Sequence, residues 1–164
     1  MLSKVTQFGS PTKAVLALGL LASAAAFSGS AFAGECPADK VMEGAVTSGE
    51  TKPVGVTDEV LSAIDLSSKG DAFKGQMLRL RKLTVQPGGV VPWHDHATRP
   101  ANITIVEGSI TEYRSNCKVP IVHKAGDTIA EFGNFSHWWK NTTKKKAVLF
   151  SADLLPPATD DHMM

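Results

Sequence analysis

The amino-acid sequence lacks a large excess of charge of either sign, because 17 Lys and Arg residues stand against 16 Asp and Glu residues. It therefore has no basic surface of the kind that predicts binding to nucleic acid or to an anionic membrane. It also lacks a helix signal of useful length outside its first 33 residues. These absences give no sign of nucleic-acid or membrane partners for the mature chain, and they favour strands over helices.

Long hydrophobic runs are also missing, with one exception near the N-terminus at residues 14–27 (AVLALGLLASAAAF). Lys4 and Lys13 precede this run, and the tripeptide AFA that ends at Ala33 matches a signal-peptidase site. The run is shorter than the ~20 residues that a bilayer span needs. We therefore interpret residues 1–33 as a cleaved signal peptide rather than a membrane anchor or a buried helix. We expect the mature chain to be periplasmic in, or secreted by, a bacterium.

Cysteine is scarce, since only Cys36 and Cys117 occur. In an exported protein an even pair predicts a disulfide, which here would join the N-terminal segment to the loop after a central strand. A free structural thiol and a metal-bound thiolate are the alternatives, because the sequence alone does not show that the two Cβ atoms meet.

The remaining sequence has the pattern of short strands separated by turns that contain Gly or Pro. In residues 76–85 (QMLRLRKLTV) leucines alternate with basic residues such as Arg79 and Arg81, which predicts a strand with one buried face, formed by the leucines. Strands at such spacing predict a β-sandwich or small barrel in one domain. The expected strands are 60–66, 76–85, 102–106, 110–113, 119–122, 128–132, 137–140 and 147–154.

We divide the chain accordingly into four parts. Residues 1–33 are the signal peptide, residues 34–75 an N-terminal segment that packs on the barrel, and residues 76–157 the barrel itself. Residues 158–164 (ATDDHMM) are expected to form a disordered tail.

Two histidines, His94 and His96, lie two positions apart in a segment that should be extended. Side chains at positions i and i+2 of a strand share one face, whereas the intervening Asp95 points to the other. Two imidazoles on one face are a good beginning for a transition-metal site.

The motifs around these histidines resemble those of the cupin superfamily. The first motif, G-x5-H-x-H-x3,4-E-x6-G, is matched at Gly88, His94, His96 and Gly108. The second motif, G-x5-P-x-G-x2-H-x3-N, is matched at Gly126, His137 and Asn141. The resemblance implies a double-stranded β-helix, or jelly-roll barrel, similar to small quercetin-dioxygenase-like cupins. It also implies a homodimer, for which residues 34–57 are the natural exchanged arm.

The resemblance further implies that His94, His96 and His137 bind one divalent transition metal. Iron is the first choice, with manganese, nickel, copper and zinc as alternatives. Ala101 stands where the motif has a glutamate ligand, so the metal would keep its full charge and up to three open positions. Such a site can act as a Lewis acid or, with iron, bind dioxygen. A barrel that has lost its metal and keeps the histidines for packing is the alternative.

Nothing in the sequence names an acid–base residue, and Tyr113, His123 and Glu112 are the candidates within reach of the metal. Arg99 and Trp139 are candidates for the substrate pocket. Each has a simpler explanation: His123 as a hydrogen-bonded structural residue, Arg99 as a solvated loop charge, and Trp139 as a core aromatic.

Three functions follow from this sequence. The first is a metal-dependent oxidoreductase, dioxygenase-like, that acts on a small organic substrate. The second is a non-catalytic exported protein that binds a small ligand or a metal, and the loss of the motif glutamate favours it. The third is a purely structural barrel. A catalytic site needs a proton-transfer group beside the metal, whereas a binding protein needs only a closed pocket.

Overall fold

The computed structural model describes residues 34–157, so the predicted signal peptide and the predicted C-terminal tail lie outside the described residues. Strands dominate this part of the chain, which contains no helix long and apolar enough to cross a membrane. The strands are β1 (Val54–Asp65), β2 (Met77–Glu107), β3 (Ser109–Arg114), β4 (Ile121–Lys124), β5 (Thr128–Lys140) and β6 (Ala147–Leu155). Three short 3-10 helices are η1 (Ala38–Lys40), η2 (Ser67–Lys69) and η3 (Asp71–Phe73).

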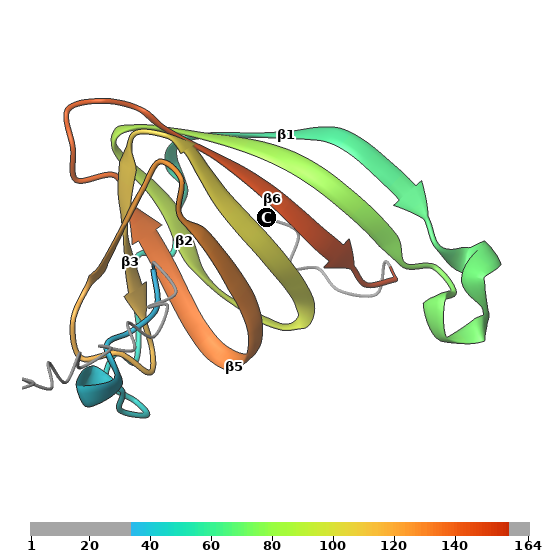
Figure 1. Ribbon diagram of the computed structural model, residues 1–164, viewed down its shortest axis with the longest axis horizontal. Coiled ribbons are helices and arrows are strands. Elements are labelled where there is room, and N and C mark those ends of the chain that lie inside the picture. Colours follow the sequence, from blue (N-terminus) through green and yellow to red (C-terminus); the bar gives the residue numbers. More distant parts are fainter. Residues whose placement is uncertain (1–33, 158–164) are drawn as a thin grey trace, which may run out of the picture.

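The strands form one antiparallel sheet that is rolled into a barrel (Figure 1). Along the main path the order is β1-β2-β5-β3-β4, and β6 pairs with β2. Strand β2 bends so far that β6 pairs with two of its stretches, residues 77–85 and residues 101–107. This double pairing closes the roll, and the all-β jelly-roll barrel predicted from the sequence is confirmed.

Strand β2 runs through a segment where the sequence predicted a break. The strand expected to end at residue 85 instead continues through a bend, where Gly88 adopts a φ of 77°. Because residues 90 and 91 already pair with β5, the chain changes direction without leaving the sheet. The two strands expected at residues 128–132 and 137–140 are likewise one strand, β5, with a register irregularity between them.

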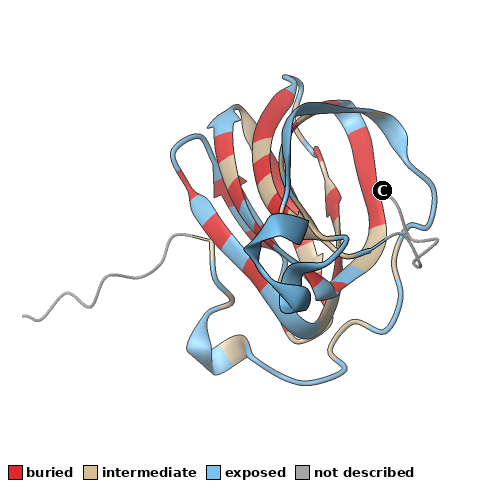
Figure 2. Cartoon of the chain, turned by 90° about the vertical axis from the view of Figure 1, so that its right-hand side faces the viewer, coloured by how far each residue is buried: buried red, intermediate tan, exposed pale blue. Residues whose placement is uncertain are grey.

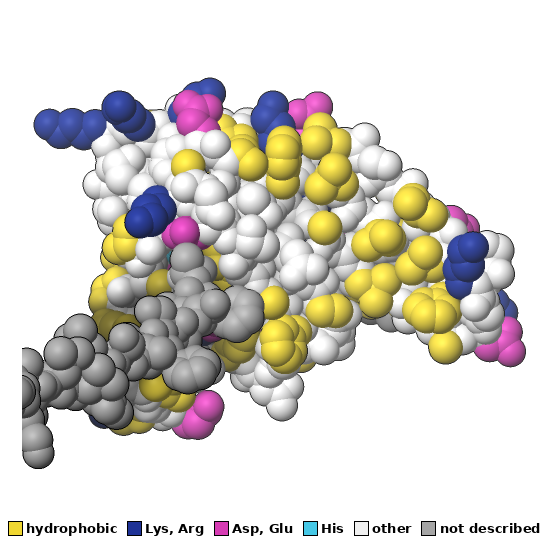
Figure 3. Space-filling view, viewed as in Figure 1, with side chains coloured by type: hydrophobic (Ala, Val, Ile, Leu, Met, Phe, Trp, Pro, Cys, Tyr) yellow, Lys and Arg dark blue, Asp and Glu magenta, His cyan; other side chains and the backbone are white. Residues whose placement is uncertain are grey.

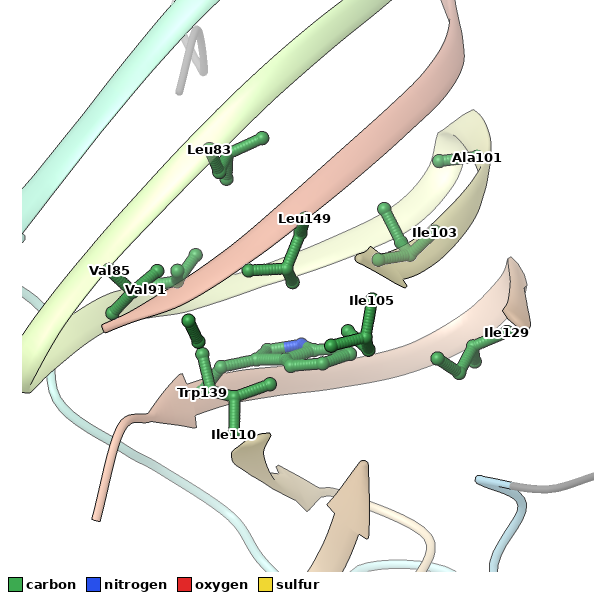
Figure 4. Packing of buried hydrophobic residues seen from close by; sticks show 11 residues of the cluster. Leu83, Val85, Val91, Ala101, Ile103, Ile105, Ile110, Ile129, Trp139 and Leu149 are labelled. Carbon is green, nitrogen blue, oxygen red and sulfur yellow. The ribbon is translucent and has the colours of Figure 1, made fainter. Parts of the chain in front are cut away.

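The hydrophobic core fills the inside of the roll, where buried and exposed residues alternate along the strands (Figure 2). Trp139 lies across its centre, close to Ile105 and Ile110 (Figure 4). Eleven residues form the cluster: Leu83, Val85, Val91, Ala101, Ile103, Ile105, Ile110, Ile129, Trp139, Ala147 and Leu149.

The buried face at the start of β2 is the opposite of the one predicted. Arg81 is only 6% exposed, whereas Leu78 and Leu80 are 42% and 40% exposed. Alternation identifies two faces but does not say which one is inside. Here Asp153 on β6 is buried and pairs with the arginine face, so the basic residues turn inward and the leucines turn outward.

The N-terminal segment lies along the barrel of its own chain. The predicted disulfide between Cys36 and Cys117 is confirmed, with the two Cα atoms 5.8 Å apart. Further along, the backbone N–H of Met42 donates to Asn116 O (3.0 Å). The N-terminal segment is therefore attached to the barrel before β1 begins.

Candidate metal centre

Three histidines meet on the inner face of the roll. His94 and His96 come from β2, and His137 comes from β5, where it is the direct cross-strand partner of His94. The Nε2 atom of His94 lies 3.1 Å from that of His96 and 3.2 Å from that of His137. The structure thus brings together all three residues that the sequence proposed as metal ligands.

The other ring nitrogen of each histidine is held by a fixed acceptor. The acceptors are Pro92 O for His94 (2.8 Å), Arg99 O for His96 (2.8 Å) and Glu112 Oε1 for His137 (2.5 Å). Since each Nδ1 donates its proton outward, each Nε2 is left with a lone pair directed into the same space. Outer hydrogen bonds of this kind orient imidazoles for a metal. The donor set therefore fits a divalent transition metal.

Burial keeps His94 in the form that binds metals. Desolvation, and next the neighbouring His137, lower the pKa of His94 to about 2, and only a neutral imidazole can be a ligand. For His137, burial acts in the same direction. The carboxylates of Glu131 and Glu112 outweigh it and raise the pKa of His137 above its ordinary value.

Glu112 is a buried carboxylate that accepts hydrogen bonds from His137 and from two other side chains. Besides His137, its carboxylate accepts hydrogen bonds from His123 Nε2 (2.9 Å) and from two nitrogens of Arg114 (2.8 and 2.9 Å). Burial raises the pKa of Glu112, but the hydrogen bonds from His123 and His137 outweigh burial and hold it well below its usual range. Glu112 therefore stays ionised and fixes the orientation of His137.

A second buried carboxylate, Glu131 on β5, lies near the histidines and, like Glu112, approaches Nδ1 of His137. Its Oε2 lies 2.9 Å from His96 Nε2, and its Oε1 lies 3.6 Å from His137 Nδ1. The sequence reasoning missed Glu131. The available signal was its parity with Ile129 in a predicted strand, which places both on the buried face.

Comparison with known proteins decides the family. A family model described as "Cupin domain" matches residues 81–153, the stretch that carries all three histidines. The chain belongs to the cupin superfamily. No curated protein sequence matches it.

Solved structures similar to this cupin share its fold at low sequence identity. A predicted oxalate decarboxylase from Thermotoga maritima is 16% identical, with 65% of this chain and 93% of that chain covered and a TM-score of 0.49. An oxalate oxidase in complex with the substrate analogue glycolate is 19% identical (66% and 55% covered, TM-score 0.46). An uncharacterized protein with a double-stranded β-helix domain from Klebsiella pneumoniae is 16% identical (70% and 84% covered, TM-score 0.49).

His94 and His96 of the candidate metal centre line a cavity of about 580 Å³, a volume that includes open solvent at its entrance. Its apolar lining is Val56, Leu83, Val91, Ile103, Trp139 and Leu149. Arg99 and Trp139, the two residues proposed for the pocket, both line it, and so do His94, His96 and Glu131.

A cluster of arginines at the cavity was not foreseen, except for Arg99. Buried Asp153 accepts two hydrogen bonds from Arg79 (3.0 and 2.7 Å) and one from Arg99 (3.3 Å). Arg81 bonds Asp58 (2.5 Å), while its Nε lies 3.4 Å from Asp153 and makes no hydrogen bond. Three guanidinium groups thus surround the carboxylates of Asp58 and Asp153, and Glu131 is a further carboxylate in the cavity lining.

The structure does not bring the candidate proton-transfer residues into the cavity. Tyr113 is the cross-strand partner of Trp138 and stacks on it, with ring centroids 4.3 Å apart, on the face opposite His137. His123 is fully buried between Glu112 and the ring of Trp139, 4.6 Å from the latter. It therefore touches the metal centre only through Glu112.

Proposed function

We propose that this cupin is an exported, metal-dependent oxidoreductase, dioxygenase-like, that acts on a small organic acid. The observation that carries the proposal is the convergence of three Nε2 atoms, whose rings are each held by a hydrogen bond at Nδ1, beside a cavity that His94 and His96 line. The disulfide supports export, because such bonds persist in oxidising compartments.

The ligands of the metal would be His94, His96 and His137. When bound, the metal supplies Lewis-acid chemistry or, as iron, oxidation by dioxygen. The chain's own residues set the conditions: Glu112 holds the imidazole of His137, and the apolar wall around Trp139 limits water near the histidines.

The arginines support an acidic substrate. Arg81 and Arg99 both line the cavity, and the Nε of Arg81 is a buried donor without a hydrogen-bond acceptor. A carboxylate that entered beside them would accept from guanidinium groups, which suit planar anions. The apolar remainder of the lining would contact a short carbon skeleton.

Metal analysis of untagged mature protein tests the centre. We expect about one equivalent of metal in the wild type and none in H94A or H137A, because each loses a converging nitrogen. H123Q is the matched control, since His123 is buried and bonded to Glu112 but directs no atom into the cavity. A wild-type protein that takes up none of iron, manganese, nickel, copper or zinc would refute the proposal.

Oxygen uptake by the iron-loaded protein tests the substrate class. Small carboxylic acids should stimulate uptake, whereas the corresponding methyl esters should not, because esters lack the charge that the arginines attract. R81Q should raise KM for the acid more than it lowers kcat.

A non-catalytic binding protein is the alternative, and one observation favours it. Within residues 34–157, neither Tyr113 nor His123 lines the cavity, so neither of these proton-transfer candidates touches a bound ligand. The alternative predicts that metal and carboxylate bind together with no consumption of oxygen or acid. Turnover of any acid by the wild type, lost in H94A, would exclude it.

A further inference from the structure

We infer that Glu131 replaces the lost motif glutamate as a metal ligand, supplied from the neighbouring strand. The inference rests on the proposed metal centre and deepens it by assigning a fourth protein ligand. It is carried by the pairing of β2 with β5, the burial of Glu131 and the spacing of the donor atoms.

The register places Glu131 directly opposite the motif position. Ala101 on β2 and Glu131 on β5 are Cα partners in the antiparallel ladder. Directly opposed residues point to the same face, with Cβ atoms about 5 Å apart. A carboxylate moved from position 101 to position 131 therefore still faces the same wall of the cavity. Ala101 is small, which leaves room for the longer side chain across the ladder.

The donor spacing matches that of neighbouring ligands around one ion. Bonds of ~2.1 Å at right angles place adjacent donor atoms about 3.0 Å apart. The distances are 2.9 Å from Glu131 Oε2 to His96 Nε2, 3.1 Å from His96 to His94, and 3.2 Å from His94 to His137. The three histidine nitrogens lie within 4.8 Å of one another, whereas the carboxylate contacts His96 at one end of this series. It would complete the ligand set by turning from His96 toward His94.

The partners of buried Glu131 are two of the proposed metal ligands, His96 (2.9 Å) and His137 (3.6 Å). Glu131 is 2% exposed, and its Oε1 makes no hydrogen bond. Nδ1 of His96 bonds Arg99 O, and its Nε2 lies 2.9 Å from Oε2 of Glu131. Buried carboxylates are paired or coordinate metals, and a cation between these atoms satisfies both.

The ligand set is then three neutral nitrogens and one anionic oxygen, as in the motif that the sequence lacks at Ala101. The bound divalent ion would carry a net charge of +1 with its ligands. An ion with six positions keeps two of them for a substrate, fewer than the three-histidine set alone would leave.

Cobalt(II) affinity, measured by competition with a chromophoric chelator, tests this assignment. E131Q keeps the size of the side chain and removes its charge. It should weaken binding at least ~100-fold, since even outer-shell changes cost 10–100-fold. The double variant A101E/E131A returns the carboxylate to the motif position and should bind cobalt within about tenfold of the wild type. E131A alone should match E131Q.

The control is E107Q, because Glu107 also lies on the sheet but is exposed and pairs with Lys146. It should bind like the wild type. Wild-type affinity in E131Q, or a double variant that binds no better than E131A, would overturn the inference. If instead the wild type binds no metal, the proposed function fails with it, whereas loss in H94A with retention in E131Q overturns the role of Glu131 alone.

Discussion

Replacement of Glu112 by glutamine should weaken both the fold and the metal centre. Glu112 is fully buried and accepts hydrogen bonds from His123, Arg114 and His137. A glutamine has one acceptor oxygen and no charge, so it cannot serve all three donors. The guanidinium of Arg114 then keeps the half-exposed carboxylate of Glu35, at 3.0 Å, and the ring of Phe135, at 4.5 Å.

The expected loss of stability follows from the broken ion pair. Removal of one partner of a buried pair costs about 3–5 kcal/mol, and the remaining contact to Glu35 favours the lower end. With an m-value of about 2 kcal/mol/M, the urea midpoint of the metal-free protein should fall by about 1.5 M.

The sign of the pH dependence is fixed by the depressed pKa of Glu112 in the folded state. A depressed carboxyl pKa stabilises the fold above the unfolded value of about 4.3, and the stabilisation is lost as the pH falls through the folded value. The gap between wild type and E112Q should therefore be full at pH 7 and narrow below about pH 4.

Cobalt affinity distinguishes a role of Glu112 in orienting His137 from a role in packing alone. Loss of the fixed acceptor behind His137 should weaken cobalt binding 10–100-fold. E59Q is the control, because the contact of Glu59 with Lys82 is long (4.0 Å) and exposed, and should be worth less than about 1 kcal/mol. An E112Q protein with the urea midpoint and cobalt affinity of the wild type would show that Glu112 neither stabilises the fold nor orients His137.

Two further predictions concern parts of the chain away from the metal. The C36S/C117S variant should lose about 4 kcal/mol of unfolding free energy on the chain-entropy model, because the disulfide spans 81 residues; an unchanged urea midpoint would contradict it. A homodimer remains a prediction, and we place its contact on the outer face of the β1–β2 ribbon rather than in an exchange of residues 34–57. There Leu80 and Ile64 are exposed, hydrophobic side chains gather (Figure 3), and β1 is an edge strand. Light scattering should give a dimer for the mature wild type and a monomer for L80K, whereas a monomeric wild type would exclude the contact.

The parts of the site that the sequence revealed depend on short-range geometry. His94 and His96 share a face because they are two residues apart on a strand, whatever the rest of the fold does. Gly108 is fixed by an equally local need: its φ is 76°, and a Cβ there would lie 2.3 Å from Lys146 O. Motifs record such requirements well, and the barrel and its histidines could be predicted for that reason.

The parts that the sequence concealed depend on which strands lie side by side. Arg81 alternates with leucines, and only its distant partner Asp153 decides that the arginine face is the inner one. The same holds for the carboxylate at the metal centre. Read along β2 alone, Ala101 is a lost ligand and argues for a protein without catalysis. On the neighbouring strand, Glu131 is the direct partner of Ala101. The small residue is therefore on β2 and the acid on β5, at the same level of the cavity wall. The absence of a motif residue therefore shows only that one strand does not supply the group. Whether the site lacks it depends on the residue in register on the neighbouring strand.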